Sequence, residues 1–320
     1  MALTSIEFCA GAGGQAIGLE KAGFEHRALV EIERDCCETL RLNRPEWNVI
    51  EADMNKFDGA KYVGVDLFAG GLPCPPFSVA GKQLGEKDER NLFPAAIRLI
   101  DQIRPKAVMI ENVRGFLDAV FEDYREELRT KLFKMGYMTG WRLLNASDFG
   151  VPQLRPRVII VALRKDLWDR FDWPQVAQHN PATVGETLKD LMASRGWVGA
   201  RAWAAGADEI APTVVGGSKK HGGPDLGPTR AKRAWASLGV DGMGIADLPP
   251  GPDESIRFKP RLTVPMVARI QGFPDDWKIS GRKTAAYRQI GNAFPPPVAQ
   301  AVATQIKKAL SAKRLIRVAA

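Results

Sequence analysis

The chain has 320 residues and a mass of 35.1 kDa, and 45% of its residues are apolar while 26% are charged. This balance excludes a disordered or fibrous protein, and the length suits one large domain or two. Lysine and arginine outnumber acidic residues by 45 to 37, which gives a net charge of +8. A charge of this sign admits a polyanionic partner, as a weak hypothesis.

The basic excess is confined to two segments. Residues 301–320 contain five basic residues and no acid, and residues 219–233 contain five basic residues and one acid. The first segment is typical of a solvated helix end. Glycines and prolines in the second predict a loop, and loops often bind ligands.

The first apolar stretch is short and leads directly into glycines, which fits neither a signal peptide nor a transmembrane helix. The four cysteines, Cys9, Cys36, Cys37 and Cys74, form no CxxC pair. This pattern argues against a disulfide framework or a zinc site. We therefore expect a cytoplasmic protein without a membrane contact or a metal.

Strand and helix patterns alternate over the first 165 residues. Strand patterns occur at 5–9, 27–32, 63–69, 107–110 and 158–163, and helical spacing occurs at 14–22, 34–42, 92–103 and 121–133. The last three strand patterns have the length of buried parallel strands. The alternation predicts an α/β fold with a doubly wound, mostly parallel sheet and helices on both faces.

Residues 170–258 are rich in Gly, Pro, Ala and Trp, with little periodicity, and we expect a loop-rich insertion there. Helix-forming sequence returns at 287–301, and a basic helix closes the chain. We predict a sheet domain of residues 1–172 plus 285–320. A smaller, loop-rich domain of residues 173–284 would form a second lobe.

A glycine-rich turn, residues 11–14, separates the first strand from the first helix. Glycines there let the backbone approach a ligand, which the helix amides face. Glu31 ends the next strand, 20 residues after Gly11, where a carboxylate can bind ribose hydroxyls. Gly11, Gly13 and Ala16 also fit a dinucleotide-binding pattern. The prediction is an adenosine-type cofactor, and the alternative is a tight turn with an exposed Glu.

Cys74 follows the strand pattern at 63–69, between two prolines. Ligands bind beyond the carboxyl ends of such strands, so this cysteine is a candidate nucleophile. Glu111 follows the pattern at 107–110 and would share this rim as a general acid if its pKa is raised. The alternatives are an inert cysteine and an ordinary polar strand end.

Three polar residues, Gln153, Arg155 and Arg157, open the strand pattern at 158–163. Alternation along a strand would place them on one face, which suits a phosphate or a base carbonyl. A salt-bridged face of an edge strand is the alternative.

The order of these motifs, completed by RQIGNAFP at residues 288–295, resembles that of the cytosine-C5 DNA methyltransferases. The resemblance covers about residues 1–165 and 258–300, and the stretch between them corresponds to the family's target-recognition region. It implies transfer of a methyl group from S-adenosyl-L-methionine to cytosine in a short specific duplex DNA site, with S-adenosyl-L-homocysteine as the product and no metal. The enzyme would serve a restriction-modification system or act alone.

The resemblance also assigns cofactor residues. Gly11 and Gly13 would allow close backbone approach, Glu31 would bind the ribose, Asp53 the adenine amino group, and Asn292 the methionine end. The full implied set is Phe8, Cys9, Ala10, Gly11, Gly13, Gly14, Glu31, Ile32, Asp53, Met54, Gly71, Pro73, Leu92, Asn292 and Ala293.

The implied chemistry begins with attack of the Cys74 thiolate on carbon 6 of a flipped cytosine. Glu111 would protonate or hydrogen-bond ring nitrogen 3, and Arg155 and Arg157 would steady the base carbonyl and the active-site loop. Residues 79–93 match the family's mobile loop, and residues 261–263 and 271–274 match the segment that supports the recognition region. The predicted DNA-binding residues are Ser78, Lys82, Gln83, Arg90, Gln153, Lys219, Lys220, Arg230 and Arg233.

Three positions depart from the family pattern. Cys9 replaces a usual aromatic residue, Pro75 a usual Gln and Asn91 a usual glycine, and none of these changes removes a group that methyl transfer needs. The neighbouring Phe8 should face the other side of its strand.

Three alternatives stay open. They are a catalytically silent DNA-binding relative, a nicotinamide-dependent oxidoreductase and an RNA methyltransferase of the related branch. The Cys-Phe-Thr motif that this RNA branch favours is absent here. For the main interpretation the expected partners are double-stranded DNA and a cognate restriction endonuclease. We expect a bacterial cytoplasmic monomer that joins the nucleoid when it binds DNA.

Overall fold

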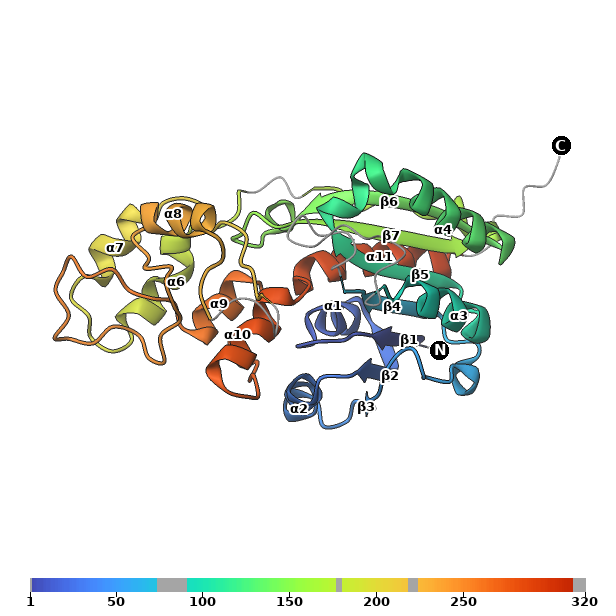
Figure 1. Cartoon of the computed structure of the whole chain (residues 1–320), viewed down its shortest axis with the longest axis horizontal. Coiled ribbons are helices and arrows are strands. Elements are labelled where there is room, and N and C mark those ends of the chain that lie inside the picture. Colours follow the sequence, from blue (N-terminus) through green and yellow to red (C-terminus); the bar gives the residue numbers. More distant parts are fainter. Residues whose placement is uncertain (1, 74–90, 177–179, 218–223, 313–320) are drawn as a thin grey trace.

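A computed structural model describes residues 2–73, 91–176, 180–217 and 224–312, and its centre is a seven-stranded sheet (Figure 1). The strand order is β3-β2-β1-β4-β5-β7-β6. The strands are β1 Leu3–Phe8, β2 Phe24–Glu31, β3 Val49–Glu51, β4 Leu67–Gly71, β5 Ala107–Val113, β6 Tyr137–Asn145 and β7 Pro156–Arg164. The expected α/β fold is confirmed.

Strands β1 to β5 are parallel, whereas β7 runs antiparallel to both β5 and β6. The prediction of a parallel strand at 158–163 was therefore wrong. Only ten residues join β6 to β7, and so short a connection reverses the chain rather than crossing over the sheet. Strand β6 itself was missed because much of it is half-buried and its apolar residues do not alternate regularly.

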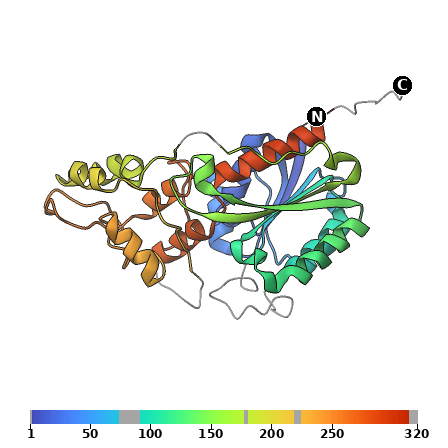
Figure 2. The ribbon, with the colours of Figure 1, turned by 90° about the horizontal axis from the view of Figure 1, so that it is seen from above.

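Helices cover both faces of the sheet (Figure 2). On one face α1 packs against α11, so closely that a Cβ on Gly18 would lie 2.4 Å from the Ala299 Cβ. On the other face α3 and α4 close an apolar core around Phe8, Phe68 and Val108. The helices are α1 Gly14–Ala22, α2 Arg34–Asn43, α3 Phe93–Ile103, α4 Glu122–Lys134, α5 Lys165–Trp168 and α11 Pro296–Ser311.

Short 3-10 helices complete the part of the chain around the sheet. They are Ala60–Tyr62, Arg114–Leu117, Ala119–Phe121 and Ala146–Phe149. The last of these lies in the connection between β6 and β7 and helps to reverse the chain.

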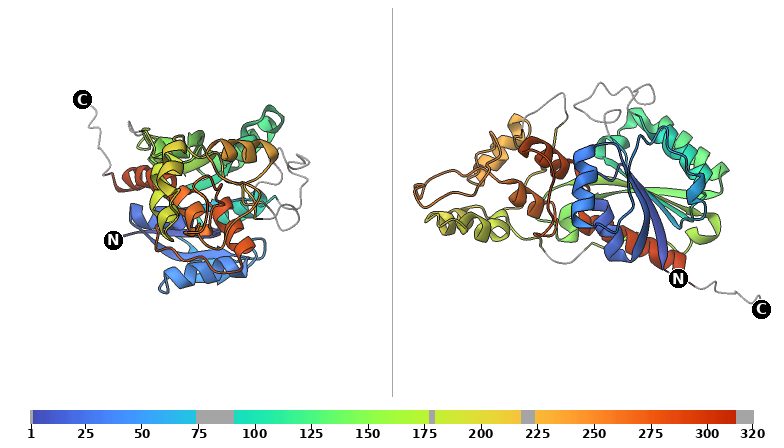
Figure 3. Two further views of the ribbon diagram at one scale, coloured as in Figure 1. Left: turned by 90° about the vertical axis from the view of Figure 1, so that its left-hand side faces the viewer. Right: turned by 90° about the horizontal axis from the view of Figure 1, so that it is seen from below.

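In its described residues, the stretch expected to be loop-rich contains three helices, α6 Val184–Ala193, α7 Ala200–Gly206 and α8 Thr229–Ser237. They lie at the end of the molecule away from the sheet, with α9 Val264–Ile270 and α10 Lys283–Asn292 between (Figures 1 and 3). Buried tryptophans, Trp197, Trp203 and Trp235, close their core. The rest of the described stretch forms loops, and the three helices were not predicted because they are short and much of their core comes from loop residues.

Candidate functional site

The carboxyl ends of β1, β2, β4 and β5 meet at one edge of the sheet, where the N-terminal end of β7 joins them. Across this edge Gly71 at the end of β4 pairs with Glu111 in β5, and Val113 pairs with Arg157 in β7. Ligands of open α/β sheets bind outside this edge. The structure therefore brings together the glycine turn, the end of β4 and the Glu111 strand.

The glycine turn has a backbone that few side chains tolerate. Cys9 and Gly11 have φ values of 55° and 53°, and Gly13 has a φ of 88°. A non-glycine residue at positive φ is uncommon, and such strain is often found at binding sites. Among the described residues, no atom other than those of Gly11 and its two chain neighbours lies within 4 Å of an ideal Cβ built on Gly11, so the described structure leaves open space beside this residue.

Glu31 holds the turn in place. One carboxylate oxygen accepts a hydrogen bond from the Gly11 amide, and the other accepts bonds from the Ile32 and Glu33 amides, each at 2.8 Å. Burial raises the pKa of Glu31, and the three amide bonds oppose this rise. The oxygen that binds Gly11 has a second lone pair, so the carboxylate can still accept a hydrogen bond from a ligand hydroxyl. Beside it the apolar side chain of Ile32 is 60% exposed, a surface that suits a flat ring.

Asp53 follows β3, whose last residue, Glu51, pairs with Glu31. Its side chain is half-buried and accepts hydrogen bonds from the amide of Asn55 at 2.9 Å and from its side chain at 3.1 Å. The neighbouring Met54 is buried. Burial, followed by the charges of Glu31, Glu7 and Asp53, raises the pKa of the Cys9 thiol.

Phe8 does not reach the open edge. It is fully buried, and its ring stacks on Phe68 and meets Phe57 edge to face. Side chains alternate along β1, and this alternation places the Phe8 ring in the core beneath the sheet. The predicted contact between the Phe8 side chain and the cofactor therefore has no support.

Glu111 and Arg157 form a buried pair at this edge. The Arg157 Nε donates to the Glu111 Oε1 at 2.7 Å, with side-chain exposures of 14% and 9%. Burial raises the pKa of Glu111, while the charges of Arg157 and Arg155 lower it. A raised pKa keeps a carboxyl protonated at higher pH, as a general acid needs. A Cβ on Gly71 would lie 3.6 Å from the other Glu111 oxygen, so the carboxyl faces the end of β4.

Gln153 and Arg155 do not share a strand face with Arg157. Strand β7 begins at Pro156, and both residues precede it; both are buried, whereas Leu154 between them is 48% exposed. Gln153 donates to the Gln271 side chain and accepts a hydrogen bond from the Val214 amide at 2.9 Å. Arg155 also binds Val214, through the carbonyl, whereas Arg157 pairs with Glu111, so the three side chains do not converge on one spot.

The C-terminal motif, residues 288–295, lies against the glycine turn. A Cβ on Gly14 would lie 2.1 Å from the backbone oxygen of Phe294. Helix α10 ends at Asn292, whose side chain donates to the Gly217 carbonyl at 3.2 Å, and Ala293 is nearly buried. Residues 292–293 are thus near the start of α1, although more than 270 residues separate the two in sequence.

Several candidates lie outside the described residues. They are Cys74, Ser78, Lys82, Gln83, Arg90, Lys219 and Lys220. Gly71 and Pro73 lead toward Cys74 from the end of β4, and Leu92 is the residue just before α3. Arg230 and Arg233 are exposed and three residues apart on α8, and therefore share a face of that helix.

Sequence reasoning did not predict the contacts of two residues near the site, Asn91 and Gly216. Asn91 accepts a hydrogen bond from the Phe93 amide at 3.1 Å, and its amide group donates to the Tyr124 hydroxyl at 3.1 Å, which anchors the start of α3. Gly216 touches Gly291, since a Cβ on Gly291 would lie 2.5 Å from the Gly216 Cα. An Asn two residues before a helix, whose side chain can accept a hydrogen bond from the backbone, was a usable signal, whereas the contact between distant glycines had none.

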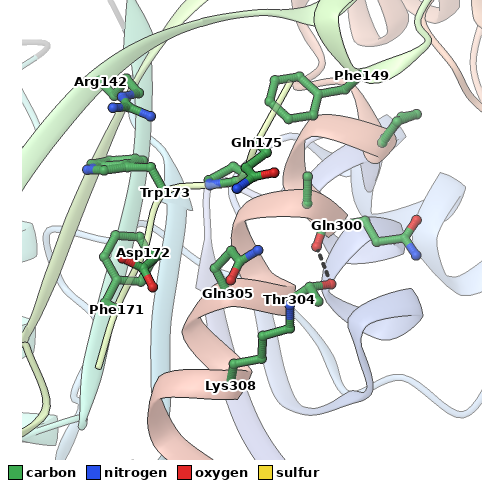
Figure 4. Close-up of a pocket in the computed structure, with 13 residues that line it drawn as sticks. Arg142, Phe149, Phe171, Asp172, Trp173, Gln175, Gln300, Thr304, Gln305 and Lys308 are labelled. Carbon is green, nitrogen blue, oxygen red and sulfur yellow. Dashed lines mark hydrogen bonds between the residues drawn. The ribbon is translucent and has the colours of Figure 1, made fainter. Parts of the chain in front are cut away.

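A cavity of about 1020 Å³ lies elsewhere, between α11 and residues 171–175 (Figure 4). Its wall includes Arg142, Phe149, Trp173, Gln300 and Lys308. None of the predicted site residues lines it, so it is not the site described above. In the described part of the chain no group of three or more His, Cys, Asp or Glu side chains could hold a metal ion.

Comparisons with known proteins decide the family. The sequence model of the C-5 cytosine-specific DNA methylase family matches residues 3–221 and 230–308. This chain belongs to that family. Methylation of carbon 5 of cytosine in DNA is accordingly the activity of this DNA methylase.

Curated relatives of this DNA methylase agree with the match. It is 58% identical to the Type II methyltransferase M.NaeI of Lentzea aerocolonigenes, over 97% of this chain and 76% of the relative. It is 55% identical to the Type II methyltransferase M.NgoMIV of Neisseria gonorrhoeae, over 97% of this chain and 99% of the relative.

Solved structures share the fold of this DNA methylase at low identity. The methyltransferase EhMeth of Entamoeba histolytica superimposes with a TM-score of 0.67 at 16% identity, over 96% of this chain and 98% of that one. The Dnmt2 methyltransferase of S. pombe superimposes with a TM-score of 0.64 at 16% identity, over 97% of this chain and 99% of that one. Among the described helices of this DNA methylase, none has the length and apolar character that crossing a bilayer requires.

Proposed function

We propose that this DNA methylase uses S-adenosylmethionine to methylate a cytosine flipped out of a short, specific duplex site, through a covalent adduct with Cys74. The position of Glu111 carries the proposal. This buried carboxyl binds Arg157 and faces Gly71, three residues before Cys74 in the sequence. A proton donor, a cation and the approach to a nucleophile therefore meet at the strand edge that also holds the glycine turn.

Cys74 supplies the nucleophile for this reaction. Its thiolate forms a bond to carbon 6 of cytosine, and the electron pair of the 5,6 double bond moves toward carbon 5. Glu111 donates its proton or a hydrogen bond to ring nitrogen 3 and so stabilises the charge placed on the ring. Arg157 orients Glu111 and binds the base carbonyl. After carbon 5 takes the methyl group, a base removes the carbon 5 proton and the thiolate leaves, which restores the double bond.

The residues of the glycine turn fit S-adenosylmethionine, which supplies an electrophilic methyl group when bound. The open space beside Gly11 admits a ligand, Glu31 binds the ribose, and the exposed Ile32 packs on the adenine. The remaining proposed cofactor residues are Cys9, Ala10, Gly13, Gly14, Asp53, Met54, Gly71, Pro73, Leu92, Asn292 and Ala293.

Duplex DNA lies between the sheet domain, residues 1–172 plus 285–320, and a target-recognition domain of residues 173–284. The exposed Arg230 and Arg233 on α8 support this arrangement because their face offers two cations to phosphates. Lys219, Lys220, Ser78, Lys82, Gln83 and Arg90 contact DNA in the same proposal. The enzyme acts as a cytoplasmic monomer within a restriction-modification system, alongside a cognate endonuclease.

The experiment is a trapping assay with duplex DNA that contains 5-fluorocytosine. Carbon 5 of this base carries no removable proton, so the Cys74 adduct cannot break down after methyl transfer. With S-adenosylmethionine present, the wild-type chain is expected to form a covalent complex that survives denaturing electrophoresis. Cys74→Ser is expected to abolish the complex, while Cys36→Ser, which changes a buried cysteine of α2, leaves it intact. No trapping by the wild-type chain, or unchanged trapping by Cys74→Ser, contradicts the proposal.

A further inference from the structure

Arg155 is a fully buried cation that binds three backbone carbonyls. Its side chain is 1% exposed, and one terminal nitrogen, Nη1, donates to the Val214 oxygen at 2.7 Å. The other, Nη2, donates to the Gly291 oxygen at 2.9 Å and the Ala293 oxygen at 3.0 Å. One guanidinium therefore joins two backbone segments that are far apart in the sequence.

The two segments belong to different halves of the proposed site. Val214 lies just before residues 218–223, which include the predicted DNA contacts Lys219 and Lys220. Gly291 and Ala293 flank Asn292, the residue proposed for the methionine end of the cofactor. The guanidinium thus fixes the base of a DNA-reading segment to the turn that closes the cofactor site.

Further contacts join the same two segments. The Tyr287 hydroxyl of α10 donates to the Val215 oxygen at 3.0 Å, and the Asn292 side chain donates to the Gly217 oxygen at 3.2 Å. Gly216 and Gly291 touch through their backbones. We call residues 214–217 and 291–293, with the Arg155 and Tyr287 side chains that bind them, the seam.

The chemistry of the seam suits arginine. Gly291 contributes a carbonyl at the C-terminal end of α10, where the helix dipole favours a cation. A guanidinium has several donors in a fixed plane and keeps its charge, whereas a lysine ammonium is a point charge on a flexible chain. A lysine at this position would keep the charge but could not hold three carbonyls in this planar geometry.

We propose that Arg155 is a positioning residue that couples DNA binding to cofactor binding through the seam. This inference rests on the proposed function. A ligand that orders residues 214–217 also orders residues 291–293, because the same guanidinium binds both. The second ligand then loses less conformational freedom when it binds, so each ligand increases the affinity for the other.

The experiment measures the dissociation constant of S-adenosylhomocysteine by calorimetry, with and without a duplex oligonucleotide. The oligonucleotide carries the site that bisulfite sequencing finds methylated in a host expressing the chain. For the wild-type enzyme, DNA is expected to tighten cofactor binding by about 5-fold or more, the lower end of measured couplings. Arg155→Lys and Tyr287→Phe are each expected to reduce this factor to less than about 2.

Arg125→Lys is the matched control. Arg125 is also a buried arginine that binds two backbone carbonyls, those of Phe116 and Asp118 at 2.7 and 2.9 Å, but it lies outside the seam. This variant is expected to keep the wild-type coupling factor. If circular dichroism shows that Arg155→Lys does not fold, Tyr287→Phe decides the test alone, since it removes a single hydroxyl.

Two results overturn the inference. The first is a wild-type coupling factor near 1. The second is a folded seam variant that keeps the wild-type coupling factor and differs from the wild type only in a lower melting temperature. Failure of the proposed function is distinguishable, because the wild-type chain would then transfer no methyl group to DNA. A chain that methylates DNA but binds its two ligands independently contradicts only the role of Arg155.

Discussion

Glu111→Gln separates the chemical role of this side chain from its structural role. The substitution keeps the size of the side chain and an oxygen that can accept the 2.7 Å hydrogen bond from Arg157. It removes the charge and the acidic proton. Positioned general acids contribute about 10²- to 10⁴-fold to rates. We therefore expect methyl transfer to slow by this factor, about 3–5 kcal/mol in the barrier at 1.36 kcal/mol for each tenfold change.

The effect on stability is expected to be small by comparison. Removing one partner of a buried ion pair usually destabilises a protein by about 3–5 kcal/mol. Here burial raises the pKa of Glu111 despite the attraction of two arginines, so the ionised carboxyl already sits unfavourably in the folded protein. Gln removes that penalty and keeps a hydrogen bond, and the free energy of unfolding should therefore fall by less than this range.

The assay is single-turnover transfer of a tritiated methyl group to duplex DNA at a series of pH values. Because the pKa of Glu111 is raised, its protonated form persists to higher pH than that of an exposed glutamate. Wild-type activity should fall as pH rises through this raised pKa, and Glu111→Gln should lack this dependence.

Asp66→Asn is the matched control for Glu111→Gln. Asp66 is a buried carboxylate just before β4, at the opposite edge of the sheet, and it binds Lys106 at 2.7 Å. Its loss should reduce stability without slowing methyl transfer. The reasoning fails if Glu111→Gln keeps the wild-type rate within tenfold, or if Asp66→Asn slows transfer as much.

Two further predictions concern stability and DNA binding. Glu7 in β1 is fully buried, and neither of its carboxyl oxygens has a hydrogen-bond partner among the described residues. Burial raises the pKa of Glu7 well above the usual value, and the nearby charge of Glu31 raises it further. The folded state therefore holds a proton that the unfolded state releases, so wild-type stability should fall by about 1.4 kcal/mol per pH unit between the unfolded and folded pKa. Glu7→Gln should lack this fall in urea unfolding across pH, and parallel stability curves would contradict the reasoning. For DNA binding, Arg230→Ala and Arg233→Ala should each reduce the slope of log affinity against log salt by about one, with equal loss on specific and non-specific duplexes. An unchanged slope in fluorescence anisotropy titrations would place α8 away from the phosphates.

Local signals predicted the first part of the fold well. Helix α1 covers the expected residues 14–22 because left-handed glycines, Gly13 and Gly23, bound it. The strand edge that carries Glu31, Gly71 and Glu111 followed from strands ending in polar or glycine residues. In each case the deciding interaction is local, so the sequence pattern contains it.

The direction of β7 and the helices α6 to α8 depended on interactions that no window of sequence contains. An apolar run such as that of β7 is equally compatible with a parallel or an antiparallel neighbour, and only the short connection from β6 decides. The core of helices α6 to α8 brings Trp203 of α7 and Trp235 of α8 together with Trp197 from the connection between α6 and α7, and short helices depend on such contacts between separate segments.

Arg155 and Arg157 show most clearly how far sequence reasoning reaches. The two arginines are two residues apart, and the family resemblance assigned them together to the base carbonyl and the active-site loop. The strand begins between them, so Arg157 pairs with a carboxyl across the sheet while Arg155 binds carbonyls 59, 136 and 138 residues further along the chain. Residue type alone predicts that a buried arginine needs acceptors. Which acceptors Arg155 binds depends on how α10 and residues 214–217 pack together. Because of that packing, Arg155 is a candidate link between the DNA site and the cofactor site rather than a residue that contacts the base.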